Sequence, residues 1–209
     1  YVVSFGPVFG LHGAYIFPSN FGVAVDLDYA GTTQKYTWKS GLNSYDVSDK
    51  LNYFEVPILL RKYSKGGGFY FELGPKFSFL TSAKESFESS SSSPFNHSDQ
   101  NVKDGYSKMV ISGAFGIGGQ FAIAKNLYVD AGLRFAYGFT DATVSFSQME
   151  LTKKGAAGEV SLGENYAHIT QSGGFDYKST HAATGHVIIG LTYRISDGKE
   201  GAAVRKKKR

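Results

Sequence analysis

The run GFYFELGPKFSFL, residues 68–80, restricts the possible folds most, because large apolar side chains occupy every second position. Side chains of a β-strand alternate between two faces, so this period of two predicts a strand with one wholly apolar face. The opposite face carries Glu72 and Lys76 together with glycine and serine. Such a strand requires an apolar environment on one side and a polar, narrow one on the other.

Six further segments alternate in the same way, which predicts seven strands and an all-β fold. These segments are 5–17, 21–30, 52–62, 109–123, 127–140 and 187–195. The 26 glycines, five prolines and 15% aromatic residues among 209 positions also favour strands in a single barrel. There is no run of about 20 apolar residues, so a membrane-spanning helix is excluded while a spanning β-barrel is not. The absence of cysteine excludes disulfides and thiolate sites.

The connections between the predicted strands alternate between short and long. Tight turns are predicted at 18–20, 64–67 and 124–126, and long polar loops at 34–50, 81–107 and 141–185. Short connections at one end of a barrel and long ones at the other are typical of outer-membrane β-barrels.

The size of the polar residues indicates which face meets water. A soluble ligand-binding barrel, the main alternative, would place the apolar face inside. However, the polar faces are rich in glycine, alanine and serine, and inward aromatic residues from seven strands would overfill a small barrel. We therefore expect the apolar faces to contact lipid. The predicted lipid-facing aromatic residues are Phe69, Phe71, Phe77, Phe79, Phe135 and Tyr137.

The charged residues of the polar faces are predicted to fill the lumen. They are Asp26, Asp28, Glu55, Arg61, Glu72, Lys76, Asp130, Arg134 and Arg194, with His12 as a further candidate. Unpaired charges in a confined interior are costly, so we expect them to form a salt-bridged plug.

The strand count predicts one strand more than the seven that the pattern shows. Antiparallel barrels of this class have an even number of strands, and the first and last of seven would run parallel. We therefore expect an eight-stranded antiparallel transmembrane β-barrel whose first strand lies upstream of Phe5 or at Tyr1. Mid-strand prolines remove ladder hydrogen bonds, so a β-bulge is expected near Pro57 or Pro75.

Residues 1–195 are predicted to form the barrel and residues 196–209 a basic C-terminal tail. Residues 205–209 supply five positive charges, so the rest of the chain is nearly neutral although the formal net charge is +4. Such a tail either binds nucleic acid or anionic lipid, or has no binding role and is solvated. We expect a solvated tail and no nucleic-acid partner.

No stretch of the sequence predicts an enzyme, a cofactor or a metal site. Ser112 lacks the preceding glycine of a hydrolase elbow, and the GIGG run at 116–119 lacks the lysine of a phosphate loop. His168, His181 and His186 in and beside the last long loop are either a loop metal site or solvated, and we expect the latter. Tyr36, Trp38 and Tyr45 in the first long loop either contact a partner or pack on one another.

The segment LNYFEVPILLRKYS, followed by GFYFELGPKFSFLTSAK, resembles the central hairpin of the Bacteroidota outer-membrane β-barrel family, the PorT-like or OmpX-like small barrels. The later pair Tyr137–Gly138 fits the same pattern. The resemblance implies a bacterial outer-membrane location with long loops outside and a periplasmic C-terminus. Some members of that family resemble components of secretion or gliding machinery, and most have no assigned activity. We predict an accessory or interaction subunit that lies in outer-membrane lipid and binds another envelope protein. The alternatives are a narrow passive pore, a rim-located envelope enzyme and a soluble ligand-binding barrel.

Overall fold

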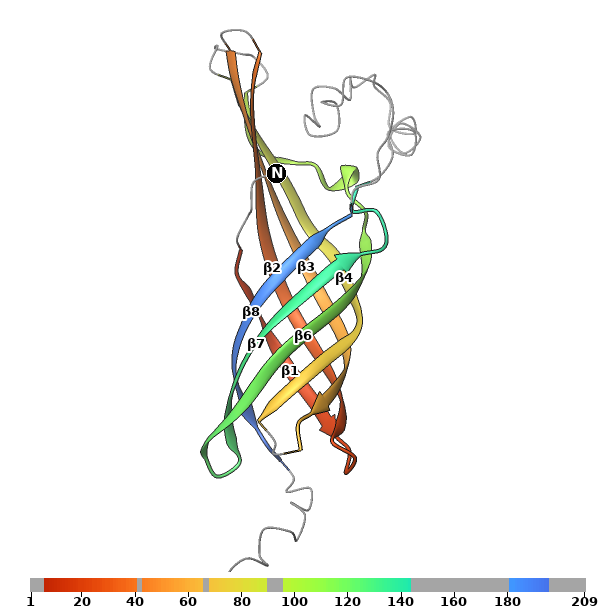
Figure 1. Cartoon of the computed structure of the whole chain (residues 1–209). Coiled ribbons are helices and arrows are strands. Elements are labelled where there is room, and N and C mark those ends of the chain that lie inside the picture. Colours follow the sequence, from red (N-terminus) through yellow and green to blue (C-terminus); the bar gives the residue numbers. More distant parts are fainter. Residues whose placement is uncertain (1–5, 41–42, 66–67, 90–95, 144–180, 196–209) are drawn as a thin grey trace, which may run out of the picture.

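The computed structural model of the chain describes residues 6–40, 43–65, 68–89, 96–143 and 181–195 (Figure 1). Seven long strands form one antiparallel sheet, which confirms the predicted fold class. They are β1 (Val8–Ile16), β2 (Phe21–Ser40), β3 (Asn43–Tyr63), β4 (Phe69–Ser89), β6 (Met109–Ala124), β7 (Leu127–Gly138) and β8 (Ala183–Tyr193). A short strand, β5 (His97–Asn101), pairs with β4, and a 3-10 turn, η1 (Lys103–Gly105), follows it. Among these residues, no helix has the length and apolar character needed to cross a bilayer.

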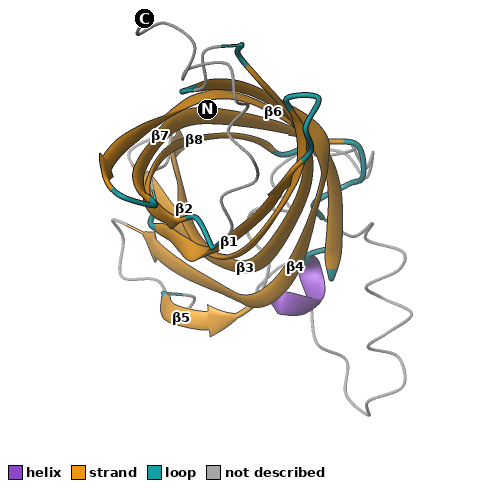
Figure 2. Ribbon diagram, turned by 90° about the horizontal axis from the view of Figure 1, so that it is seen from below, coloured by secondary structure: helices purple, strands orange, loops and turns teal. Residues whose placement is uncertain are grey.

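The sheet curls into a barrel wall that surrounds a lumen (Figure 2). Each strand pairs with the next along the path from β1 to β8, and every pairing is antiparallel. With seven strands, β1 and β8 run in the same direction, and no pairing within the described ranges joins them. The seven predicted strands are thus present, and the eighth stays a prediction.

The prediction of short turns at one end of the barrel is confirmed, but two of the predicted long loops are wrong. Residues 34–50 continue β2 and β3 as a hairpin, with pairing up to Ser40 and Asn43. Within 81–107, β4 runs on to Ser89 and β5 and η1 follow. Residues 34–50 are polar yet include Tyr36, Trp38, Tyr45 and Val47, which favour strands, and their outer face is suited to water. The upper part of β4 continues this sheet by pairing with β3 up to Ser89. Residues 144–180 of the third predicted loop lie outside the described ranges.

The outer surface of the barrel is a continuous apolar band. Phe71, Leu191 and Ile189 are 69%, 72% and 79% exposed, respectively, and neighbouring strands present similar residues. Monomeric soluble proteins do not expose apolar patches of this extent. Phe69, Phe71, Phe79, Phe135 and Tyr137 are exposed in this band, and Phe77 is half-buried on the same face.

A bulge in β4 separates the barrel from the part of the sheet above it. Tyr53 pairs with Leu80 while Asn52 pairs with Ser82, so Thr81 is an extra residue. The register is unbroken from Pro57–Lys76 to Leu60–Leu73, so the prediction of a bulge beside Pro57 or Pro75 is wrong. The extra residue is needed higher up, where β4 leaves the barrel and its inward positions change from even to odd numbers.

The upper halves of β2, β3 and β4, together with β5 and η1, form a structure that we call the extension (Figure 1). Figure 2 shows β5 and η1 beyond the ring of strands, next to β3 and β4. The extension has its own apolar core, which consists of Leu51, Leu80, Ala83, Val102 and Tyr106. A separate core above the apolar band allows these strands to remain ordered without lipid contact.

Candidate functional site

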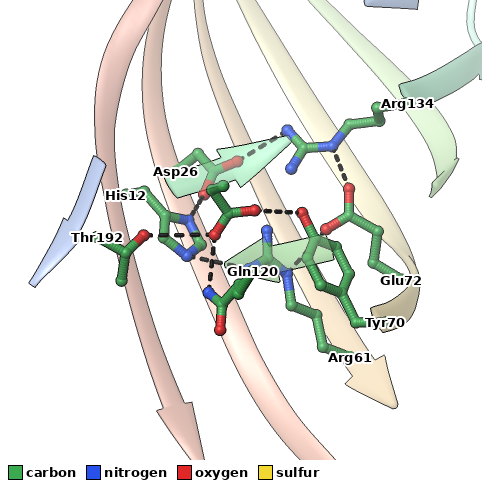
Figure 3. Close-up of polar contacts among 9 residues, drawn as sticks. His12, Asp26, Arg61, Tyr70, Glu72, Gln120, Arg134 and Thr192 are labelled. Atoms are coloured by element: carbon green, nitrogen blue, oxygen red, sulfur yellow. Dashed lines mark hydrogen bonds and ion pairs between the residues drawn. The ribbon is translucent and has the colours of Figure 1, made fainter. Parts of the chain in front are cut away.

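The centre of the lumen is crossed by a network of ion pairs (Figure 3). Arg134 donates from Nη1 to Asp26 at 2.8 Å and from Nε to Glu72 at 2.6 Å. Arg61 donates from Nε to the other oxygen of Glu72 at 2.8 Å. The side chains of these four residues are at most 8% exposed. Charges from β2, β3, β4 and β7 therefore meet at one level of the barrel and neutralise each other.

His12 attaches the edge strand β1 to this network. Its Nδ1 contacts Asp26, and its Nε2 lies 3.1 Å from Nη1 of Arg61. A guanidinium can only donate hydrogen bonds, so Nε2 of His12 must accept one. The proton of a neutral imidazole then resides on Nδ1 and is donated to Asp26. His12 thus links β1 both to Asp26 on β2 and to Arg61 on β3.

A second group of contacts lies nearer the short turns, where Tyr70, Gln120 and Thr192 (Figure 3) donate to Asp130. The carboxylate accepts hydrogen bonds from Tyr70 at 2.7 Å, from Gln120 at 2.7 Å and from Thr192 at 3.3 Å. The guanidinium of Arg61 lies 4.2 Å from the ring centre of Tyr70, which connects this group to the central network. Sequence reasoning missed these three uncharged donors, although each occupies a lumen-facing position of its strand.

A third group lies on the extension side of the centre. Lys76 Nζ donates to Glu55 Oε1 at 2.8 Å, and Ser78 Oγ donates to the same oxygen at 3.0 Å. Lys76 also reaches Oγ1 of Thr184 on β8, at 3.4 Å. The side chains of Lys76 and Glu55 are 3% and 6% exposed. This pair is therefore shielded from water almost completely.

Glycines in the wall make room for these long side chains. A Cβ at Gly116 would lie 2.7 Å from Oε1 of Glu72, and a Cβ at Gly118 would clash with the Tyr70 ring. Small residues on the lumen face of one strand thus accommodate charged or aromatic side chains from its neighbour. This complementarity explains why the polar faces of the sequence combine charges with glycine and alanine.

Two of the predicted lumen charges lie apart from the network. Asp28 is on the lumen side of β2, partly exposed, and no ion pair reaches it from the described residues. Arg194 follows β8 at the short-turn end, where its guanidinium lies 4.5 Å from the ring centre of Tyr128. The structure brings the other seven predicted residues into the three groups described above.

The extension carries a second set of polar groups on the face that continues the lumen. Asp49 and Glu85 are directly opposite each other on β3 and β4, and both are fully buried. Asp49 accepts a hydrogen bond from Tyr106 at 3.0 Å, and Glu85 lies 3.3 Å from Nε2 of His97. These contacts tie β5 and η1 to the long strands.

Aromatic residues gather near the tip of the extension. Phe87 stacks on His97 with ring centres 5.9 Å apart, and Tyr45 lies 6.2 Å from Phe87. Tyr45 was predicted as a loop contact and belongs to this group. Tyr36 and Trp38 lie on β2, but their side chains are not among those described.

The histidines expected to be solvated are spread over different environments. His181 contacts the carbonyl oxygen of Gly138 at 3.0 Å and stacks on Tyr137, whereas His186 lies on the lumen side of β8. His168 and the tail 196–209 lie outside the described ranges. Within those ranges, no three His, Asp or Glu side chains are placed to hold a metal ion.

Comparison with known proteins gives one match. Residues 1–144 match a protein-family model described as outer membrane protein beta-barrel domain. This range covers β1 to β7 and includes the extension. No curated protein and no solved structure matches the chain.

Proposed function

Because the chain belongs to the outer membrane protein β-barrel domain family, we propose that it is a lipid-embedded scaffold whose extension binds another envelope protein. The observation that carries this proposal is the length of β2, β3 and β4, at 20, 21 and 21 residues. A strand needs only about 9–11 residues to cross a bilayer. About half of each strand is therefore available above the apolar band.

The filled lumen supports an interaction role rather than transport. Ion pairs from four strands occupy the centre, and Lys76 and Glu55 occupy the next level. Groups engaged in such contacts hold the wall together, and their side chains are at most 8% exposed. The same engagement leads us to propose that the lumen carboxylates are structural and that the protein is not an enzyme.

The tip of the extension is the surface that we assign to the partner. Tyr45, Phe87 and His97 present adjacent rings on one face, and aromatic side chains are enriched at the energetic centres of protein interfaces. The barrel would hold this face at a fixed height above the membrane. We further propose that the extension is extracellular, that the C-terminal tail is periplasmic, and that no nucleic acid is bound.

The finer family relation belongs to the same proposal. We propose that the chain is close to the PorT-like small barrels of Bacteroidota, on the strength of the hairpin formed by β3 and β4, and that its partner belongs to a secretion or gliding machine. We also propose that an eighth strand, antiparallel to both β1 and β8, closes the barrel. Slow hydrogen exchange of the β1 amides that point away from β2 would support that closure.

The test is native mass spectrometry of the protein extracted gently from its own outer membrane. We expect a stoichiometric partner, which the double variant Tyr45→Ser/Phe87→Ser loses. The matched control Tyr45→Phe/Phe87→Tyr keeps both rings and should retain the partner. A protein that is found alone in every extract would refute the interaction role.

A narrow pore is the second candidate, because Asp28 faces the lumen and is partly exposed there. Single-channel recording in a planar bilayer distinguishes the two functions. Stepwise conductance from the unaltered protein would favour the pore, and its absence would favour the scaffold.

A further inference from the structure

Lysines gather on the outer face of the extension, just above the apolar band. Lys50 on β3 and Lys84 on β4 are directly opposite each other and both are exposed. Residues opposite each other in a sheet share a face, and like charges in such a pair are unfavourable on their own. An anionic group nearby would therefore stabilise this pair.

The anionic group within the protein compensates only part of this charge. Asp99 on β5 accepts a hydrogen bond from Lys50 at 2.9 Å, and both side chains are about half exposed. The pKa of Asp99 is lowered by this hydrogen bond and by the ammonium charges of Lys50 and Lys84. One carboxylate thus faces two lysines, and a positive charge remains.

Further lysines approach the same level from the segment between β5 and β6. Lys103 on η1 donates from Nζ to the carbonyl oxygen of Thr81, the extra residue of the bulge, at 3.1 Å. Lys108 is exposed directly before β6, and its carbonyl oxygen accepts a hydrogen bond from Leu80. Asp104, also exposed, is the only acidic residue of η1. Four lysines and two aspartates leave this region positively charged.

The height of the cluster matches that of lipid headgroups. The apolar band ends at Phe54 on β3 and at Phe79 on β4. Lys50 lies four residues beyond Phe54, which is about 13 Å along the strand and about 10 Å along the axis of a barrel with tilted strands. Lysine side chains extend toward an interface while their stems stay on apolar surface, so the ammonium groups can descend to the phosphate layer.

We propose that Lys50, Lys84 and Lys103 bind the phosphate of a lipid headgroup in the membrane leaflet that surrounds the extension. The acyl chains of that lipid would lie on the apolar band below, beside Phe54 and Phe79. The identity of the leaflet that supplies the lipid rests on the membrane orientation proposed above. The lysine site itself does not depend on that orientation. Its physical role would be to fix the height and tilt of the extension, and with it the position of the partner surface.

The test measures lipid retention by native mass spectrometry on the purified full chain in detergent. The probe is diphosphoryl lipid A, compared with the same lipid after removal of its phosphates. Each lysine near an anionic surface contributes severalfold to binding, so Lys50→Gln/Lys84→Gln/Lys103→Gln should weaken retention by about tenfold or more. The matched control Lys65→Gln/Lys125→Gln alters exposed lysines in turns at the other end of the barrel and should change retention less than about twofold.

The outcomes separate the possible sources of binding. Equal retention of the phosphorylated and dephosphorylated lipids, or no effect of the triple variant, would overturn the proposal. Displacement of the lipid by millimolar inorganic phosphate would assign the lysines to a free anion and would also overturn it. Retention of the envelope partner by the triple variant is measured separately, in gentle extracts of the outer membrane, so a failure of lipid binding is distinguishable from a failure of the proposed scaffold function.

Discussion

The buried pair between Lys76 and Glu55 gives the sharpest test of a plugged lumen. We consider the single variants Lys76→Met and Glu55→Leu and the double variant that combines them. In each single variant, one charge stays in a site where the side chains are only 3% and 6% exposed. In the double variant, no charge of the pair remains and the volume is roughly conserved.

The expected magnitudes follow from that burial. Removing one member of a buried ion pair typically costs about 3–5 kcal/mol of unfolding free energy, whereas replacing both by apolar residues is often nearly neutral. The coupling energy of the cycle should therefore exceed about 3 kcal/mol. An exposed, hydrated pair would give a coupling energy of about 1 kcal/mol or less. Ser78→Ala, which removes only the second donor to Glu55, should cost about 1 kcal/mol.

The assay is urea unfolding of the barrel from lipid vesicles, followed by circular dichroism and extrapolated linearly to zero urea. All four proteins of the cycle must show the same dependence on urea for the comparison to hold. A coupling energy below about 1 kcal/mol would mean that water screens the pair, and the plugged lumen would then be wrong.

Three further predictions test other parts of the molecule. Replacing Glu72 and Arg134 together by serine should produce stepwise conductance in planar bilayers, because it empties the centre of the lumen; continued silence would contradict the plug. The carboxyl group of Asp99 should titrate below its ordinary pKa of 3.8, so the contribution of its pair with Lys50 to stability is complete above that pH and is lost as the pH falls through the lowered value. An ordinary pKa for Asp99 in an NMR titration would contradict this prediction. The Lys50→Gln variant should raise the pKa of Asp99 back toward its ordinary value. Tyr106→Phe should ease the opening of β5 by about 1–3 kcal/mol in hydrogen exchange while the barrel strands are unchanged, and uniform loss of protection would contradict a separate core in the extension.

The strands of the barrel could be predicted from the sequence because one alternation decides both structure and environment. Phe71 and Glu72 lie on opposite faces of any strand, so their surroundings follow from parity alone. The predicted short turns follow from local residue chemistry in the same way. Seven of the predicted lumen charges lie together because side chains at the inward positions of a narrow barrel must meet in its lumen.

Features that depend on partner strands could not be predicted. Residues 34–50 are polar, and polarity alone does not separate a loop from a sheet that stands in water. Gln120 and Thr192 carry no charge to mark them, and their role is visible only once Asp130 is placed beside them. The bulge at Thr81 compensates a change of environment along β4, whereas Pro57 and Pro75 only suggested a local defect.

The extra residue at Thr81 shifts by one the numbering of the positions of β4 that point inward. Below it, β4 points Leu80 and the other even-numbered positions inward; above it, Ala83 and Glu85 take that side and Lys84 faces out. Deleting this one residue would leave the composition of both parts intact but would exchange inside and outside along the whole upper half of the strand. The barrel and the extension can thus share the single strand β4, although inward positions are even-numbered in one and odd-numbered in the other. The one inserted residue makes the two arrangements compatible.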